Sequence, residues 1–155
     1  MSEFRLNPRY TEAISTLVNR SPYFSLISME IKELQWGTSI LEVELEEKHL
    51  QPFGYVHGGA IASVIDAATF WAVFPQVKDG MGLTTVEIKV NYLAPVQEGR
   101  VVAKGRCIKM GRTLALGEAY INSAEGSLLA HGTATMMILP DLKVEGQDNL
   151  PPKLI

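Results

Sequence analysis

The sequence contains a single cysteine among its 155 residues, so no internal disulfide can form, and we expect a reducing, cytoplasmic environment. We interpret Cys107 as a small apolar residue of a strand rather than as a nucleophile. Residues 1–5 lack the basic-then-apolar pattern of a signal peptide. No apolar run reaches the roughly 18 residues that a membrane-spanning helix needs, which predicts a protein without a membrane partner.

Blocks of basic charge are also missing. Lys and Arg total 14 against 17 Asp and Glu, the two signs are interspersed, and the net charge is −3, which argues against a nucleic-acid partner. The hydrophobic content of 46% and the length predict one globular domain, which we assign to residues 1–139. Residues 140–155 contain several prolines and no periodicity, so we expect a loose tail.

Hydrophobic periodicity predicts two helices among many strands. Tyr10–Asn19 has the pattern of a short amphipathic helix, and a long apolar helix is predicted from about Gly58 to about Phe74, before Pro75. The remaining patterned segments are interpreted as strands, at residues 24–34, 38–46, 85–93, 101–108, 113–122 and 128–139. This order predicts an α+β protein with a largely antiparallel sheet.

Small residues gather on one face of the last two predicted strands. They are Thr113, Ala115, Gly117 and Ala119 on one strand, and Ala130, Gly132 and Ala134 on the next. Such residues leave a trough in which the single long helix can lie close to the sheet. We therefore expect an antiparallel sheet wrapped around one central helix. Its open edges favour self-association.

A glycine-rich turn leads directly into the long helix. The stretch from Gln51 to Ala60 contains the run His57-Gly58-Gly59, and Asp66 is the only charged residue between His57 and Lys78. A carboxylate in an apolar helix is costly to bury unless it is paired or has a chemical role. Asp66 is therefore the first candidate for a catalytic residue.

Several motifs in this order resemble one enzyme family. They are Gln51, Gly54, His57-Gly58-Gly59, Asp66 nine residues after the histidine, Val86–Pro95, the hairpin 109–115 and the hairpin 122–132. The set, spread over residues 21–139, resembles the acyl-CoA thioesterases of the phenylacetyl-CoA and human thioesterase-superfamily-member type. The resemblance implies a hot-dog fold and hydrolysis of an acyl- or aryl-CoA to the free acid and CoA. It also implies a homodimer or homotetramer with active sites at subunit interfaces, and no metal or other cofactor.

The resemblance assigns roles to the matched residues. Asp66 would act as general base or as nucleophile, and the sequence leaves both open. The Gly58 backbone N–H, at the first turn of a helix, would stabilise the oxyanion, although both glycines also suit a tight turn. Gln51 would hold the attacking water or the substrate carbonyl. Thr85 would assist, although strand alternation places Thr84, not Thr85, on the face of Val86.

Substrate contacts are expected at two further places. Lys109, Gly111 and Arg112 form a basic hairpin turn suited to the phosphates of CoA, or to solubility alone. His57, with Gly59, is assigned to the substrate site, or its ring caps the helix. His49 and His131 have no metal-ligand spacing to a cysteine or carboxylate cluster, so no metal site is predicted.

Two other functions fit the same fold. One is a non-catalytic module that senses acyl-CoA, but only about twenty residues precede the domain, too few for a helix-turn-helix. The other is a hydratase. Those relatives place an Asp and a His together at the helix start, whereas His57 and Asp66 lie nine residues apart. The retained Asp66 favours catalysis over sensing.

Overall fold

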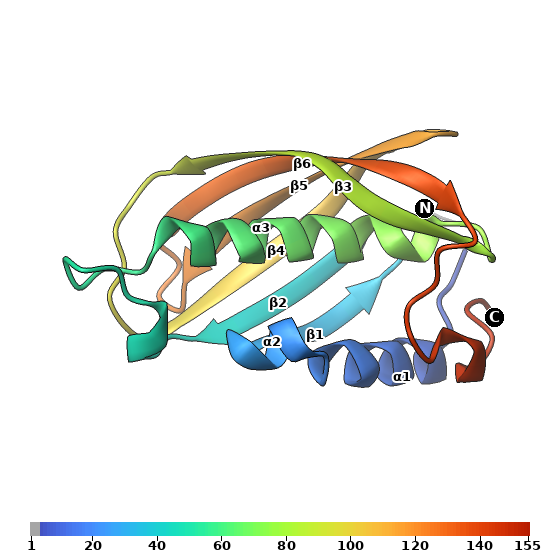
Figure 1. Cartoon of the computed structure of the whole chain (residues 1–155), viewed down its shortest axis with the longest axis horizontal. Coiled ribbons are helices and arrows are strands. Elements are labelled where there is room, and N and C mark those ends of the chain that lie inside the picture. The colour runs from blue at the N-terminus through green and yellow to red at the C-terminus, as the bar shows by residue number, and fades with distance from the viewer. Residues whose placement is uncertain (1–3) are drawn as a thin grey trace.

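A computed structural model describes residues 4–155 as a sheet curved around one helix (Figure 1). The helices are α1 (Pro8–Asn19), α2 (Pro22–Leu26) and α3 (Gly58–Val73), and the strands are β1 (Met29–Gln35), β2 (Thr38–Glu44), β3 (Met81–Tyr92), β4 (Arg100–Met110), β5 (Leu114–Ser123) and β6 (Leu128–Pro140). The six strands have the order β1-β2-β4-β5-β6-β3, and every neighbouring pair is antiparallel. The α+β architecture with a central helix and a short N-terminal helix is confirmed.

Glycines and other small residues allow α3 to lie against the sheet. A Cβ atom on Gly105 of β4 would come within 2.2 Å of the carbonyl oxygen of Ala68, and one on Gly132 of β6 within 2.7 Å of Ile65 Cγ2. The Ser39 hydroxyl of β2 donates a hydrogen bond to the same Ala68 carbonyl at 2.7 Å. The trough predicted on the last two strands is confirmed, and it extends across β4.

The long helix is the core of the protein. Residues 58–76, which are α3 and the 3-10 turn that follows it, are long and apolar enough to cross a membrane by length and composition alone. In the fold, however, 61% of the most apolar window of this segment is buried. Ile65, Ala68 and Ala72 are fully buried between the helix and the sheet. The apolar character of α3 is therefore accounted for by packing.

The expected strand over residues 24–34 is wrong at its start. Residues 22–26 form α2, and β1 begins only at Met29. Ser21 takes the N-cap position and Pro22 lies in the first helical turn. A backbone N–H at that position would have no partner within the helix, so the missing N–H of proline costs nothing there. Phe24 is buried against the core, while the Tyr23 hydroxyl lies 2.6 Å from the Ser63 hydroxyl of α3. The short α2 thus packs beside the central helix.

Residues 140–155 have little regular structure, yet they do not lie loose. Leu154 forms an isolated antiparallel bridge with Leu6, and the Asn7 N–H donates to the Lys153 carbonyl at 2.8 Å. Val144 and Leu150 pack on the hydrophobic core. These contacts hold the segment against the rest of the fold, beside α1.

The fit of α3 against β4 predicts unequal effects of two glycine substitutions. Gly105→Ala forces a methyl group against a backbone carbonyl, so we expect a loss of about 1–3 kcal/mol in the free energy of unfolding. In Gly117→Ala, on β5, the closest atom is Thr69 Cβ at 3.1 Å, which leaves room for a small adjustment. Urea unfolding should therefore show a clearly smaller loss for Gly117→Ala. Equal losses would contradict this account of the packing.

Candidate active site

A buried histidine anchors the loop that precedes α3. His49 Nε2 lies 2.7 Å from the Ile27 carbonyl, and Nδ1 accepts a hydrogen bond from the Glu46 N–H at 2.9 Å. The His49 carbonyl in turn accepts from the His57 N–H at 2.8 Å. His49 therefore positions the loop that carries Gln51 and His57. Among residues 4–155, no group of three or more His, Cys, Asp or Glu side chains is arranged to hold a metal ion.

His57 caps the N-terminus of α3. Its Nδ1 atom accepts a hydrogen bond from the Gly59 N–H at 2.7 Å. The amides of Ala60 and Ile61 both donate to the His57 carbonyl. Among the hydrogen bonds of residues 4–155, none uses the Gly58 N–H, which lies at the positive end of the helix dipole. The structure therefore leaves this amide free to bind an anionic oxygen.

The two glycines of the turn each make room for a ring. A Cβ atom on Gly59 would lie 2.9 Å from His57 Nδ1, and one on Gly58 would lie 3.2 Å from the ring of Tyr92. Both glycines begin α3 in helical conformation. Glycine is therefore required at both positions because of space, and not because the backbone adopts a positive φ.

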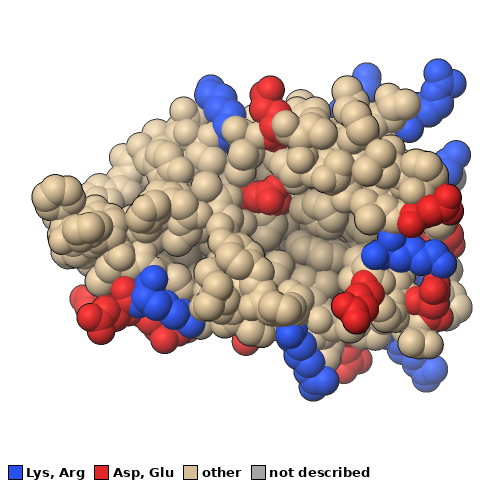
Figure 2. Space-filling view, viewed as in Figure 1, with Lys and Arg blue, Asp and Glu red and all other residues tan. Residues whose placement is uncertain are grey.

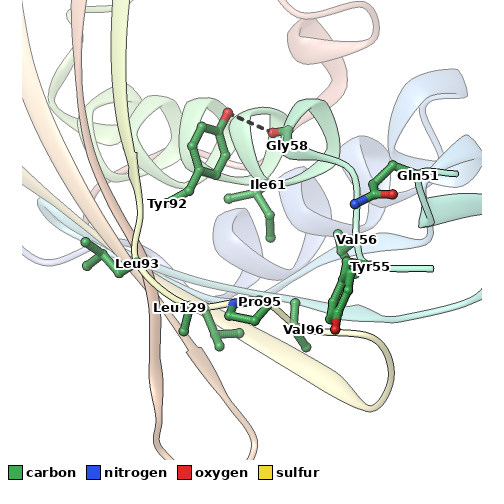
Figure 3. Close-up of a pocket in the computed structure, with 11 residues that line it drawn as sticks. Gln51, Tyr55, Val56, Gly58, Ile61, Tyr92, Leu93, Pro95, Val96 and Leu129 are labelled. Carbon is green, nitrogen blue, oxygen red and sulfur yellow. Dashed lines mark hydrogen bonds between the residues drawn. The ribbon is translucent and has the colours of Figure 1, made fainter. Parts of the chain in front are cut away.

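A pocket of about 390 Å³ opens beside Gly58 (Figure 3). Its walls are mostly apolar and come from the loop before α3, the first turn of α3 and the segment after β3; they are Gln51, Tyr55, Val56, Gly58, Ile61, Tyr92, Leu93, Ala94, Pro95, Val96 and Leu129. Gln51 Oε1 accepts a hydrogen bond from the Phe53 N–H, so the Gln51 amide nitrogen is the group left toward the pocket. The Tyr92 hydroxyl donates to the Gly58 carbonyl at 3.0 Å.

Asp66 has a partner on the edge strand. The Thr85 hydroxyl donates a hydrogen bond to Asp66 Oδ1 at 2.7 Å, and both side chains are half-buried. A β-bulge between Thr85 and Glu87 shifts the register, so Thr85 and Ile88 both face the helix. Simple alternation, which predicts Thr84 on the helix side, is therefore wrong at this point. Viewed from the same side as the cartoon, this face of the molecule is hollowed, with an acidic side chain inside the hollow (Figure 2).

The candidate residues fall into two groups within one chain. We call Gln51, His57 and Gly58 the amide half-site, and Asp66 with Thr85 the acid half-site. Asp66 follows Gly58 by eight residues, which places the two about 12 Å apart along the axis of α3. One thioester carbonyl cannot contact both groups of the same chain, because reacting atoms must approach to about 3–3.5 Å.

The basic hairpin lies on neither half-site. Lys109 and Arg112 are exposed at the turn between β4 and β5. The Gly111 N–H donates to the Leu114 carbonyl at 2.9 Å, and a Cβ on Gly111 would lie 2.4 Å from that oxygen. In the sheet, Leu114 of β5 pairs with Met137 of β6, which in turn pairs with Thr84 of β3. The hairpin therefore lies at the level of the acid half-site, two strands from the edge.

The remaining histidine belongs to the outer face of the sheet. His131 Nε2 lies 3.1 Å from Glu118, whose other carboxylate oxygen accepts from Arg106. Burial raises the pKa of Glu118, but the hydrogen bonds from His131 and Arg106 outweigh it and bring the pKa below its usual value. Since α3 covers the opposite face, His131 has a structural partner and no place in either half-site.

Solved structures define the class of fold. A thioesterase from Haemophilus influenzae superposes with a TM-score of 0.78 at 23% identity, over 86% of this chain and 92% of that one. A thioesterase from Pseudomonas aeruginosa gives a TM-score of 0.80 at 21% identity, over 90% of this chain and 99% of that one. The architecture is the hot-dog fold.

The sequence comparisons place the chain in a family. Residues 53–130 match the model of the thioesterase superfamily, and the chain belongs to that superfamily of thioester hydrolases. Human acyl-coenzyme A thioesterase 13 is 31% identical over 64% of this chain and 71% of its own. The 1,4-dihydroxy-2-naphthoyl-CoA hydrolase of Listeria monocytogenes is 29% identical over 72% of this chain and 91% of its own.

Replacement of His57 tests its role as a helix cap. His57→Ala removes the acceptor for the Gly59 N–H, so we expect a loss of about 1 kcal/mol in the free energy of unfolding. Asparagine is a favoured N-cap residue, and His57→Asn should recover most of this loss. Urea unfolding of the two variants measures the difference. If both variants are equally destabilised, the cap does not explain the presence of this histidine.

Proposed function

We propose that the protein hydrolyses the thioester of an acyl- or aryl-CoA to a free carboxylic acid and CoA. The Asp66–Thr85 pair carries this proposal, because it holds a carboxylate in a fixed position on an otherwise apolar helix. The pocket beside Gly58 has the volume and apolar lining of small-molecule sites. Membership of the thioesterase superfamily supports the reaction type.

The reaction needs an attacking oxygen and a site for negative charge. In one route, Asp66 takes a proton from water while the water oxygen adds to the thioester carbon. The Gly58 N–H then stabilises the tetrahedral oxyanion, and the Gln51 amide binds the carbonyl oxygen or the water. As the C–S bond breaks, the CoA sulfur takes the proton back from Asp66. In the other route, Asp66 attacks the carbon directly, the C–S bond breaks and the CoA thiolate leaves. Water then hydrolyses the resulting anhydride to the free acid and the Asp66 carboxylate, and the proton released from that water goes to the thiolate. Thr85 orients the carboxylate in both.

For this chemistry to occur, the amide half-site of one chain must meet the acid half-site of another chain. The strand that carries Thr85 is an edge of the sheet, and its apolar side chains Val86 and Ile88 are 52% and 39% exposed. A long edge strand of this kind is suited to pairing with a second copy. We therefore place the active sites at the interface of a homodimer, which can pair again into a homotetramer.

The positions of the half-sites support antiparallel pairing of β3 with its symmetry mate. Tyr92 lies beside Gly58 and Thr85 beside Asp66, so the two half-sites lie near opposite ends of one face of β3. A two-fold axis near Ile88 exchanges these ends. The amide half-site of one protomer then meets the acid half-site of the other, and each dimer contains two complete sites.

The rest of the substrate is assigned by chemistry. The apolar pocket beside Gly58 suits the acyl or aryl group. We assign His57 and Gly59, the chain neighbours of Gly58, to substrate contacts at this turn. Lys109, Gly111 and Arg112 suit the phosphates of CoA, through two exposed cations and a backbone turn. No step calls for a metal or other cofactor. We retain the cytoplasm as the predicted compartment.

Asp66 supplies the carboxylate that the proposed reaction requires. Asp66→Asn keeps the size and a hydrogen-bond acceptor for Thr85 but removes the base, so kcat should fall by about 10²–10⁴. The measurement is thiol release from a panel of acyl- and aryl-CoAs, with the oligomeric state checked by sedimentation. Activity that survives in Asp66→Asn would rule out its catalytic role. A wild-type protein that binds CoA esters without releasing thiol would instead support the sensor function.

Mixing two inactive variants tests the shared site. Gly58→Pro removes the oxyanion donor, and proline is tolerated at the first position of a helix. When Gly58→Pro and Asp66→Asn chains are co-expressed in equal amounts, half of the dimers are mixed, and each mixed dimer has one intact site. Activity should therefore return to about a quarter of the wild-type value. No recovery, with dimers present, would place both groups in one chain.

A further inference from the structure

Tyr92 links the edge strand to the first turn of α3. Its backbone is fixed in the sheet, because Tyr92 pairs with Ala130 of β6 and the Leu93 N–H donates to the Leu129 carbonyl at 2.8 Å. Its hydroxyl donates to the Gly58 carbonyl at 3.0 Å (Figure 3). The phenol therefore spans the distance between a rigid strand and the start of the helix.

The ring of Tyr92 also lies close to the position that a side chain at residue 58 would take. A Cβ atom on Gly58 would lie 3.2–3.3 Å from three atoms of the Tyr92 ring and hydroxyl. The helical conformation of residue 58 does not itself require glycine. The absence of a side chain at position 58 is therefore coupled to the presence of Tyr92.

Burial does not explain this arrangement. Within one protomer Tyr92 is 57% exposed, so its ring adds little to the hydrophobic core of that protomer. A tyrosine that served packing alone would place its ring inside and its hydroxyl at the surface. Here the hydroxyl points at a backbone carbonyl of the amide half-site. The second acceptor position of that carbonyl is thereby filled, because the α-helical pattern assigns the first to the Ala62 N–H.

From these contacts we propose that Tyr92 is a positioning residue for the reaction. It holds the first turn of α3 so that the Gly58 N–H points at the thioester oxygen, and it does not itself take part in bond making. This inference rests on the proposed thioesterase function. Sequence patterns place Tyr92 only among the apolar residues of a strand face, and its contact with Gly58 arises from the tertiary fold.

Tyr92→Phe separates the hydrogen bond from the ring. We expect the net free energy of this hydrogen bond to stabilise the transition state, which corresponds to a factor of about three to ten in rate. In Tyr92→Phe, kcat should therefore fall by that factor while KM stays unchanged. A merely structural residue would lower the stability of the protein and leave kcat of the folded fraction unchanged. The matched control is Tyr120→Phe, which removes a hydroxyl from the outer face of the sheet and should leave kcat unchanged.

A double-mutant cycle tests the steric coupling. Gly58→Ala should lower kcat because the methyl group pushes the Tyr92 ring and hydroxyl a few tenths of an ångström away from the first turn of α3, which weakens the hydrogen bond to the Gly58 carbonyl. In Gly58→Ala/Tyr92→Ala the clash is gone, so kcat should equal that of Tyr92→Ala alone. If the two effects multiply instead, the methyl group acts on the substrate directly and the coupling is refuted.

Amide hydrogen exchange at Ala62 provides a readout without substrate. Its exchange should become about three- to tenfold faster in Tyr92→Phe, because the first turn of α3 loses one of its anchors. Unchanged exchange, or an unchanged kcat in an active enzyme, would overturn the inference. If the wild type hydrolyses no CoA ester while exchange at Ala62 still increases, the proposed function fails and the anchoring of the helix by Tyr92 stands.

Discussion

The close contact of α3 with the sheet is the constraint on which the rest of the protein depends. Gly105 and Gly132 bring the helix so near that a single methyl group would strike backbone or side-chain atoms. The hydrogen bonds from Thr85 to Asp66 and from Tyr92 to Gly58 both cross from sheet to helix, at 2.7 Å and 3.0 Å. Hydrogen bonds weaken steeply when stretched or bent. The glycines of the trough therefore set the geometry of both half-sites.

The edge strand β3 combines two roles that proteins usually keep apart. Edge strands are commonly short, charged or covered, because an open edge invites pairing with other chains. Here β3 carries Thr85 of the acid half-site and also Tyr92, which contacts Gly58 of the amide half-site. The apolar side chains of this strand remain exposed. The bulge after Thr85 turns its hydroxyl inward without breaking the pairing with β6. In the proposed dimer, association and chemistry thus depend on the same strand.

Much of this arrangement could be predicted from the sequence, because the informative patterns are local. The apolar character of α3, its glycine turn and the small residues facing it follow from nearby residues. The catalytic role of Asp66 rests mostly on the resemblance and stays a prediction. The bulge at Thr85 could not be predicted, because an inserted residue leaves the alternation of side chains ambiguous. The short α2 has a signal in Ser21-Pro22, which favours a helix start over a strand. The contact of Tyr92 with Gly58 joins residues 34 positions apart, and no local pattern records it.

The spacing of eight residues between Gly58 and Asp66 also has a thermodynamic consequence. When one substrate contacts groups from two protomers, its binding and the association of the protomers are linked. A CoA ester that binds the dimer and not the monomer strengthens the dimer, and tighter association raises the apparent affinity for the ester by the same factor. In the proposed dimer, dilution therefore lowers activity, and this effect weakens as substrate accumulates. Under this proposal, the dimer is most fully assembled when its substrate is most abundant.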